Sequence, residues 1–259
     1  MSLFDFNKTQ KQAQSTSYAA QRRNILSPKS SFYVRESYKT LRTNIRFFQT
    51  GEGCRRFCIT SSLAGEGKSI TLLNLAITFA EAGQKVLLID ADMRRPSQAR
   101  LLIERATPGL SNVLAGHCTE EDAVRNSPYP NLDILLSGEV PPNPSELLGS
   151  PRMKKLIDTL SEKYDYILVD APPVGVVTDA CVVARYLDGM VFLVRYNKTE
   201  KDVLTRCLQQ INNAGVRLMG FVFNGSQGES GSQYKYKYKY RQKKYGYEFV
   251  GRTANEEKK

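Results

Sequence analysis

The most informative segment of this 259-residue chain is FCITSSLAGEGKSITLLNLAITFAEAG, residues 57–83. It reads as a short strand, a glycine-rich turn, a Lys-Ser pair and a helix, which is the order that a phosphate-binding loop requires. Gly65 and Gly67 allow backbone N–H groups to close around phosphate oxygens, and the helix N-terminus adds partial positive charge. Lys68 is placed to reach the β- and γ-phosphates of a nucleotide, and the Ser69 hydroxyl to hold Mg²⁺.

Outward from this loop, short apolar runs alternate with helical stretches. The expected strands lie at 55–60, 85–90, 132–136, 166–170, 190–195 and 218–224. Expected helices begin near Phe32, where apolar residues recur at steps of three and four, and lie near 68–82, 120–126, 151–163, 178–186 and 200–213. Continuous apolar strands that alternate with helices predict an α/β fold, with a mostly parallel sheet and helices on both faces.

Aspartates end two of the predicted strands. Asp90 ends KVLLID with Asp92 two residues on, and Asp170 ends YILVD. Because ligands bind such sheets at the carboxyl ends of the strands, we expect the three carboxylates to converge on one crevice with the loop. Mg²⁺ accepts one or two carboxylates with phosphate and water, and an aspartate there can also deprotonate an incoming hydroxyl. A single such aspartate would more simply be a helix cap or a loop ion pair. For Arg94 and Arg95, which follow, the sequence leaves open a phosphate role or a surface or interface pair.

The charge of the chain is divided unevenly along its length. The formal net charge is +11 at pH 7. Residues 1–35 carry six Lys or Arg and one Asp, and residues 233–259 carry nine Lys or Arg and three Glu. The residues between them carry equal numbers of basic and acidic side chains, 22 of each. A neutral body argues against a nucleic-acid partner for the domain, while the basic ends suit anionic lipid, polyphosphate or an acidic partner.

The cysteines and the distribution of apolar residues indicate the cellular location that the sequence favours. The five cysteines form no CxxC pair, and the single histidine, His117, completes no zinc set. We therefore expect reduced thiols and no metal held by His or Cys. The chain shows no apolar run long enough to span a bilayer and no signal-peptide core, so a cytoplasmic location is expected.

Six of the 14 tyrosines lie in YKYKYKYRQKKYGY, residues 234–247. They are Tyr234, Tyr236, Tyr238, Tyr240, Tyr245 and Tyr247. The hinge before them, NGSQGESGSQ, cannot build a core. The sequence thus predicts a mobile basic arm over residues 1–31, a domain over 32–225 and a flexible tail over 226–259. Tyrosines carried next to a phosphate site suggest an enzyme that bears its own phosphate acceptors.

Taken together, the motifs resemble those of the bacterial tyrosine kinases of polysaccharide export, the BY-kinases. SSLAGEGKS resembles their Walker A motif, LLIDADMRRP a second aspartate motif called A′, and ILVDAPP the Walker B motif. The stretches LSNVLAG and PPNPSELLGSPRM and the tyrosine cluster also match, so the resemblance covers roughly residues 32–247.

The resemblance implies a tyrosine kinase that uses ATP and Mg²⁺, phosphorylates its own tail tyrosines in trans, and regulates capsular or exopolysaccharide synthesis and export. The reach of the hinge does not itself decide between cis and trans transfer. Lys68, Asp90 and Asp92 would be catalytic, with Asp90 as the base that accepts the tyrosine proton, and Ser69, Asp92 and Asp170 would hold Mg²⁺. Nucleotide contacts would come from Ser62, Gly65, Glu66, Gly67, Lys68, Ser69 and Ile70.

The resemblance also implies assembly and partners. BY-kinases form rings through an ExxRxxR helix, and here Glu36, Lys39 and Arg42 occupy the pattern. Lysine in place of the first arginine cannot make a bidentate guanidinium pair. Without the resemblance, the simpler explanation is that the three residues form the solvated face opposite the apolar stripe of the helix. The chain resembles the free cytoplasmic type of kinase, which a transmembrane activator of the polysaccharide co-polymerase type recruits to the inner face of the membrane. A protein-tyrosine phosphatase is a further implied partner.

Two other functions compete with this interpretation. Partition and division-site ATPases share the fold, modify nothing, and resemble KGGxGK[ST] at the loop, with lysine where this chain has Leu63. Alternatively the tail is a binding element, with lysines on phosphates and rings on bases or lipid. The strict loop pattern has glycine where this chain has Ser62, while Ala64 and Ile70 are departures expected to change loop stiffness more than chemistry.

Overall fold

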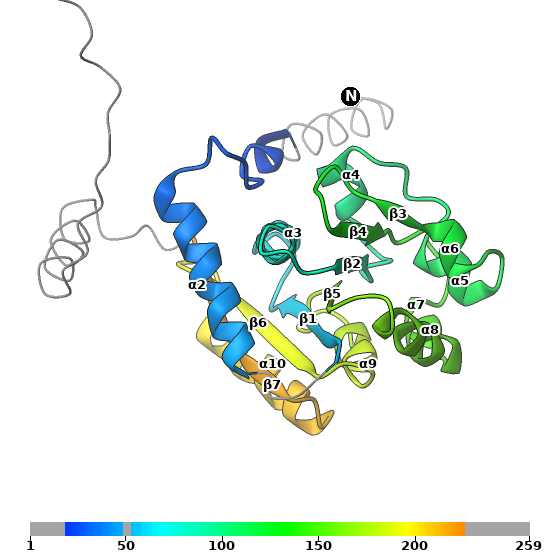
Figure 1. The fold of residues 1–259 in the computed structure, drawn as a ribbon. Coiled ribbons are helices and arrows are strands. Elements are labelled where there is room, and N and C mark those ends of the chain that lie inside the picture. The colour runs from blue at the N-terminus through cyan, green and yellow to red at the C-terminus, as the bar shows by residue number, and fades with distance from the viewer. Residues whose placement is uncertain (1–18, 49–52, 226–259) are drawn as a thin grey trace, which may run out of the picture. The chain divides into compact units, whose positions relative to one another are not determined.

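The computed structural model describes residues 19–48 and 53–225, which form one sheet between two layers of helices (Figure 1). The strands are β1 (Arg55–Ser61), β2 (Val86–Asp90), β3 (Val124–Asn126), β4 (Leu132–Leu135), β5 (Tyr166–Asp170), β6 (Gly189–Arg195) and β7 (Leu218–Asn224). They lie in the order β3-β4-β2-β5-β1-β6-β7, and all neighbouring pairs are parallel except β3 with β4. The predicted α/β fold with a mostly parallel sheet is confirmed.

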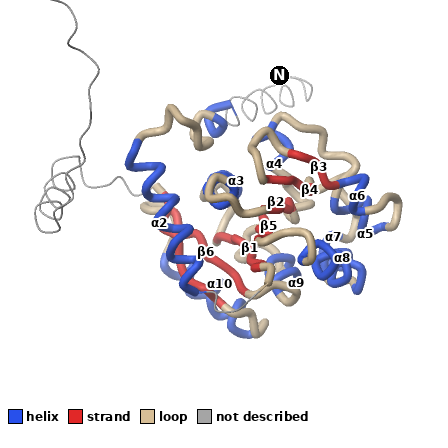
Figure 2. The backbone as a smooth tube through the Cα atoms, in the orientation of Figure 1, coloured by secondary structure: helices blue, strands red, loops and turns tan. Residues whose placement is uncertain are grey.

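Helices cover both faces of the sheet, as the tube in Figure 2 shows for its red strands and blue helices. The helices are α2 (Phe32–Phe48), α3 (Lys68–Ala80), α4 (Gln98–Leu102), α5 (Leu110–Ala115), α6 (Glu120–Ala123), α7 (Pro144–Leu148), α8 (Pro151–Ser161), α9 (Asp179–Ala184) and α10 (Lys201–Asn213). α2, α3 and α4 share one apolar core with the sheet, and α5 to α10 share the other. Alternate strand residues supply the two cores, because successive side chains of a strand point to opposite faces.

Burial explains why the central strands read as continuous apolar runs. All five residues of β2 and all five of β5 are buried, since helices cover them on both faces. β7 lies at the edge of the sheet and is less covered, so that Phe221 and Phe223 are exposed. The sheet is therefore most buried in its middle, at the carboxyl ends of β2, β5 and β1.

The helix predicted over 120–126 is wrong in its second half. α6 ends at Ala123, and residues 124–126 form β3, which pairs antiparallel with β4. Thr119 caps α6 through a hydrogen bond from the Asp122 backbone N–H (3.3 Å). The chain then extends to add an edge strand, and Asn126 donates to Asp133 of β4 (2.9 Å).

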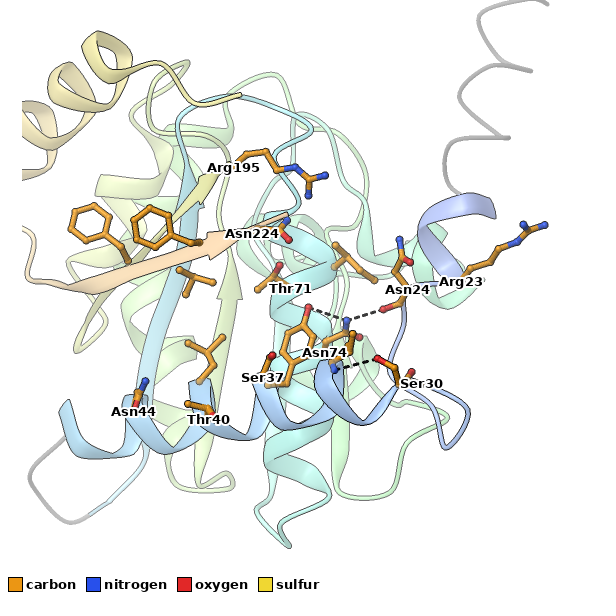
Figure 3. A pocket seen from close by; sticks show the side chains of 18 residues that line it. Arg23, Asn24, Ser30, Ser37, Thr40, Asn44, Thr71, Asn74, Arg195 and Asn224 are labelled. Carbon is orange, nitrogen blue, oxygen red and sulfur yellow. Dashed lines mark hydrogen bonds between the residues drawn. The ribbon is translucent and has the colours of Figure 1, made fainter. Parts of the chain in front are cut away.

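The end of the predicted mobile arm packs on the domain. Asn74 in the middle of α3 is buried, and its Oδ1 accepts from the backbone N–H of Leu26 (2.8 Å). Its Nδ2 donates to the carbonyl of Asn24 (2.9 Å) and to the hydroxyl of Tyr38 in α2 (3.1 Å) (Figure 3). One buried amide therefore ties residues 24–26 and α2 to α3. The proposed boundaries of the arm, domain and tail stay predictions.

Two further expectations concern membranes and the tail. Within residues 19–48 and 53–225, no helix combines the length and the hydropathy needed to cross a bilayer. The six clustered tyrosines and the rest of the segment 226–259 lie outside the described residues.

Candidate active site

The carboxyl ends of β1, β2 and β5 lie side by side in the middle of the sheet. β5 pairs with both β2 and β1, and Asp90 stands in register with Asp170. The loop that follows β1 leads into α3, whose first residue is Lys68. The phosphate loop and the predicted aspartates therefore share one edge of the sheet, where ligands of such folds bind.

The glycine-rich loop is braced by a buried carboxylate. Glu66 is buried, and its side chain accepts hydrogen bonds from the backbone N–H of Leu63 (3.0 Å) and from the hydroxyl of Thr199 (2.5 Å). Asn224, the last residue of β7, donates from Nδ2 to the carbonyl of Glu66 (2.9 Å). Because the Glu66 carboxylate is used in this way, any contact of this residue with a nucleotide must come from its backbone.

A cleft of about 740 Å³ opens at this edge. Four of the predicted nucleotide-binding residues besides Lys68 line it, namely Gly65, Gly67, Ser69 and Ile70. Ser62 is buried beneath the loop and does not line the cleft. A second groove of about 640 Å³ lies between α2, α3 and β7, and Figure 3 shows the side chains that line it. Asn24, Ile70 and Arg195 line both hollows, so the two adjoin.

Lys68 lies at the centre of the predicted metal-ligand set. Its Nζ is 3.2 Å from the Ser69 hydroxyl, 3.0 Å from Asp92 Oδ2 and 3.1 Å from Asp170 Oδ1. Burial acts to lower the pKa of Lys68, but the charges of Asp170, Asp92 and Asp90 outweigh it and raise the pKa. The ammonium is therefore firmly charged, and the three oxygen-bearing side chains already surround one cation.

This arrangement bears on Mg²⁺, which prefers oxygen ligands and usually keeps several waters. One hydroxyl and two carboxylates around a single positive charge are the donor types that Mg²⁺ accepts. In the described part of the chain, no group of three or more His, Cys, Asp or Glu side chains is placed to hold a metal alone. The donor set at Ser69, Asp92 and Asp170 thus fits a cation whose shell is completed by water and nucleotide phosphate.

Asp90 differs from the other two aspartates in its environment. It is buried, and it accepts backbone N–H bonds from Asp92 (3.2 Å), Ser97 (3.1 Å) and Gln98 (3.0 Å). Burial, together with the charge of Asp170, raises the pKa of Asp90 to about 8. A carboxyl group with a pKa near neutral pH is present in part as the carboxylate, which can accept the proton of a substrate hydroxyl.

Of the two arginines after Asp92, Arg94 makes a structural pair. It donates from Nε and Nη2 to the two carboxylate oxygens of Asp179 at the start of α9 (2.8 and 3.2 Å). The backbone N–H of Arg95 donates to Asp92 Oδ1 (3.0 Å), which fixes the loop after β2. Both arginines line the cleft.

The sequence did not single out several residues that hold the site together. Gln98 donates to Asp170 (2.8 Å), Asp179 anchors Arg94, and Thr199 and Asn224 brace the loop through Glu66. None of them lies within a motif whose spacing carries a known chemistry. Their roles arise because β6, β7 and α9 bring distant segments to the loop, which local pattern cannot show.

The predicted assembly residues lie on α2. Lys39 pairs with Glu36 on the same helix (2.8 Å), and both are accessible. Arg42 instead turns toward α3 and donates from Nη1 to the carbonyl of Thr78 (2.6 Å). Arg42 therefore supports the packing of α2 within one chain, whatever it does between chains.

A family model described as an AAA domain matches residues 55–213. The tyrosine-protein kinase YwqD of Bacillus subtilis is 40% identical over 199 residues, which cover 77% of this chain and 84% of that protein. The tyrosine-protein kinase CpsD of Streptococcus agalactiae is 35% identical over 190 residues, covering 73% of this chain and 82% of the relative. The chain belongs to the bacterial tyrosine kinases, the BY-kinases.

Solved structures agree with this membership. The BY-kinase described here matches the chimerical protein CapA2B2 with a TM-score of 0.72 and 36% identity, over 76% of this chain and 86% of that one. It matches the kinase domain of the Escherichia coli tyrosine kinase ETK with a TM-score of 0.72 and 33% identity, over 74% and 75%. The division-site protein MinD of Pyrococcus horikoshii, complexed with Mg-ADP, is less similar, with a TM-score of 0.56 and 26% identity over 68% and 72%. The BY-kinase thus shares its P-loop fold with division-site ATPases, as the sequence motifs predicted.

Proposed function

We propose that this BY-kinase transfers the γ-phosphoryl group of ATP to tyrosines of its own C-terminal cluster. The observation that carries the proposal is the meeting of Lys68 with Ser69, Asp92 and Asp170, beside a buried Asp90, at the edge of the sheet. The sequence supplies the acceptors, six tyrosines within residues 234–247.

Each residue has a chemical role in the proposed transfer. Backbone N–H groups of the loop around Gly65 and Gly67 hold the phosphates, and the Lys68 ammonium moves from the carboxylates to the phosphoryl oxygens. The tyrosine oxygen bonds to the γ-phosphorus, the bond from that phosphorus to the bridging oxygen of ADP breaks, and Asp90 accepts the phenolic proton. Ser69, Asp92 and Asp170 would hold Mg²⁺, which would supply neutralisation of phosphate charge when bound.

The proposal extends to partners that belong to the whole assembly. We propose a ring in which α2 lies at the subunit contact, with Glu36, Lys39 and Arg42 at or near it, and transfer from one chain to the tail of the next. A transmembrane activator of the co-polymerase type would bring the kinase to the inner face of the membrane, and a phosphatase would remove the phosphates. Control of capsular or exopolysaccharide synthesis and export would follow from this cycle. The similarity to CapA2B2, a chimera by its own title, supports a relation with a second component.

The test is a search for phosphotyrosine. The protein is incubated with Mg-ATP and the cytosolic segment of a candidate activator, and peptides are read by mass spectrometry. Phosphate is expected on several of the six tail tyrosines in the native chain and on none in Lys68→Met. Lys154→Met is the matched control, because Lys154 is exposed on α8 and pairs only with Asp158 among described groups. ATP hydrolysis without any phosphotyrosine would favour the division-site ATPase alternative instead.

Trans transfer has its own experiment. A Lys68→Met chain with an intact tail is mixed with an active chain whose six tail tyrosines are phenylalanine. Label on the Lys68→Met chain is expected, because only an active neighbour can place it there. Label that appears only when Lys68 and the tail tyrosines are intact in the same chain would establish cis transfer.

A further inference from the structure

Gln98 is the first residue of α4, and it is fully buried at the edge of the sheet where the active-site residues meet. Its amide nitrogen donates to Asp170 Oδ2 (2.8 Å) and to the backbone carbonyl of Ser69 (3.1 Å). Its backbone N–H donates to Asp90 Oδ2 (3.0 Å). One residue thus contacts the phosphate loop helix, the end of β5 and the end of β2.

The chemistry of these partners fixes which way the amide points. A carboxylate oxygen and a backbone carbonyl are both acceptors, so the amide NH₂ must face them and both of its hydrogens are used. The amide oxygen, Oε1, is then left buried with no hydrogen-bond partner among the described residues. A buried acceptor without a partner is unfavourable and uncommon in folded proteins, so the amide oxygen calls for a water or ligand group that completes it.

The two oxygens of Asp170 have different partners. Oδ1 lies 3.1 Å from the Lys68 ammonium, and Oδ2 accepts from Gln98. When Lys68 turns to a phosphate, Gln98 is the hydrogen-bond donor that remains on the Asp170 carboxylate among the described groups. That bond prevents rotation of the carboxylate and leaves Oδ1 free.

We propose that Gln98 is a positioning residue for the cation site, which aligns Asp170 as a metal ligand. The inference rests on the proposed binding of Mg-nucleotide at this site. Partners that orient a metal ligand typically change metal affinity about 10- to 100-fold when they are removed.

The alternative is that Gln98 only ties α4 to the sheet. The two explanations differ in what a shape-preserving substitution does. Gln98→Met keeps the length and volume of the side chain and removes the NH₂ donors and Oε1. Gln98→Glu keeps the polar shape but places a carboxylate against Asp170, so it removes the donor and adds repulsion.

The experiment measures the affinity of a fluorescent ADP analogue with Mg²⁺ and with EDTA. The ratio of the two affinities isolates the contribution of the cation and does not depend on turnover. We expect Gln98→Met to lower this ratio by about 10-fold or more while the affinity in EDTA stays the same, and Gln98→Glu to lower it further. Gln209→Met, at an exposed position of α10, is the matched control and should behave as the native chain.

Other results would overturn the inference in distinguishable ways. If Gln98→Met lowers the affinity equally in Mg²⁺ and EDTA, or changes only the melting temperature, the residue is structural. If the native chain itself shows no effect of Mg²⁺ on ADP affinity, both the inference and the proposed Mg-nucleotide site fail.

Discussion

Gly67 has a φ of 100° and lies against the side chain of Asn224, so a Cβ atom at this position would collide with the Asn224 amide. That amide is the group that holds the carbonyl of Glu66 (2.9 Å). Gly67→Ala is therefore expected to strain the backbone and to release the loop. We expect a loss of about 1–3 kcal/mol in the free energy of unfolding, together with loss of nucleotide binding, measured by urea unfolding and nucleotide titration.

Gly83 supplies the control for Gly67. It also has a positive φ, 82°, but no atom lies within 4 Å of a Cβ built there. Gly83→Ala should show the backbone strain alone and keep its nucleotide affinity. Equal loss of nucleotide affinity in both variants would mean that the contact with Asn224 does not shape the loop.

The buried carboxyl of Asp90 makes a prediction about pH. Its pKa is raised to about 8 in the folded protein, against about 3.9 for an unfolded aspartate. Between these values the folded state holds a proton that the unfolded chain has released. The stabilising contribution of this group is therefore complete below about pH 4 and is lost as the pH rises through 8.

Asp90→Asn removes this titration, so the free energy of unfolding should fall less steeply between about pH 4 and 8 in the variant than in the native protein. Urea unfolding at several pH values measures the two slopes. The slope is the informative quantity, because the variant also replaces an acceptor of three backbone N–H bonds. Parallel curves would show that Asp90 is ionised in the folded protein throughout this range.

At the scale of elements, one buried side chain of α3 bonds both α2 and the segment before it. Asn74 accepts a hydrogen bond from the Leu26 N–H. It also donates to the Asn24 carbonyl (Figure 3) and to the Tyr38 hydroxyl. Asn74→Ala leaves these groups without their partner, and we expect a loss of about 1–3 kcal/mol in the free energy of unfolding. Faster tryptic cleavage at Arg22 and Arg23 should accompany it.

Asn44→Ala tests whether this effect is specific. Asn44 lines the same groove from an exposed position on α2. Asn44→Ala removes a side chain of the same type and leaves the Asn74 hydrogen bonds in place, so the rate of tryptic cleavage should stay at the native value. If Asn74→Ala also leaves the cleavage rate unchanged, other contacts hold the segment in place.

The elements that sequence pattern predicts are those whose environment is uniform along their length. β2 and β5 are buried at every position, and α3 is long enough to show its apolar character, so each was predicted within a few residues. α4, α5 and α7 have five or six residues, which is too short for a helical period to show. β3 was missed because its three residues are strand only through pairing with β4.

The candidate site divides in the same way. Lys68, Asp90 and Asp170 were predictable, because strand ends and a glycine-rich loop place them without knowledge of the rest of the chain. Gln98 and Asn224 were not, because each acts through a tertiary contact with a residue far away in sequence.

At the scale of the whole molecule, the charge of the cleft differs between its depth and its lining. The carboxylates of Asp90, Asp92 and Asp170 are 0–4% exposed, while Arg95 and Arg195 line the cleft. The tail segment 233–247 carries six Lys or Arg and no acidic residue. In the proposed transfer, an unmodified tail would approach a cleft whose accessible side chains carry positive charge like its own, until the phosphates of a nucleotide reverse that charge.

This charge distribution predicts that nucleotide binds before the tail. A labelled peptide of residues 233–247 should bind at least about 10-fold more tightly when a non-hydrolysable Mg-ATP analogue is present, and added salt should weaken that binding. The same peptide with six phosphotyrosines carries roughly 9 to 12 added negative charges and should show the opposite preference, for the nucleotide-free protein. Arg95→Gln should reduce the effect of nucleotide on the affinity of each peptide, because it removes one of the positive charges that line the cleft. Tight binding of the unmodified peptide without nucleotide would instead show that the buried carboxylates, and not the arginines, control the approach of the tail.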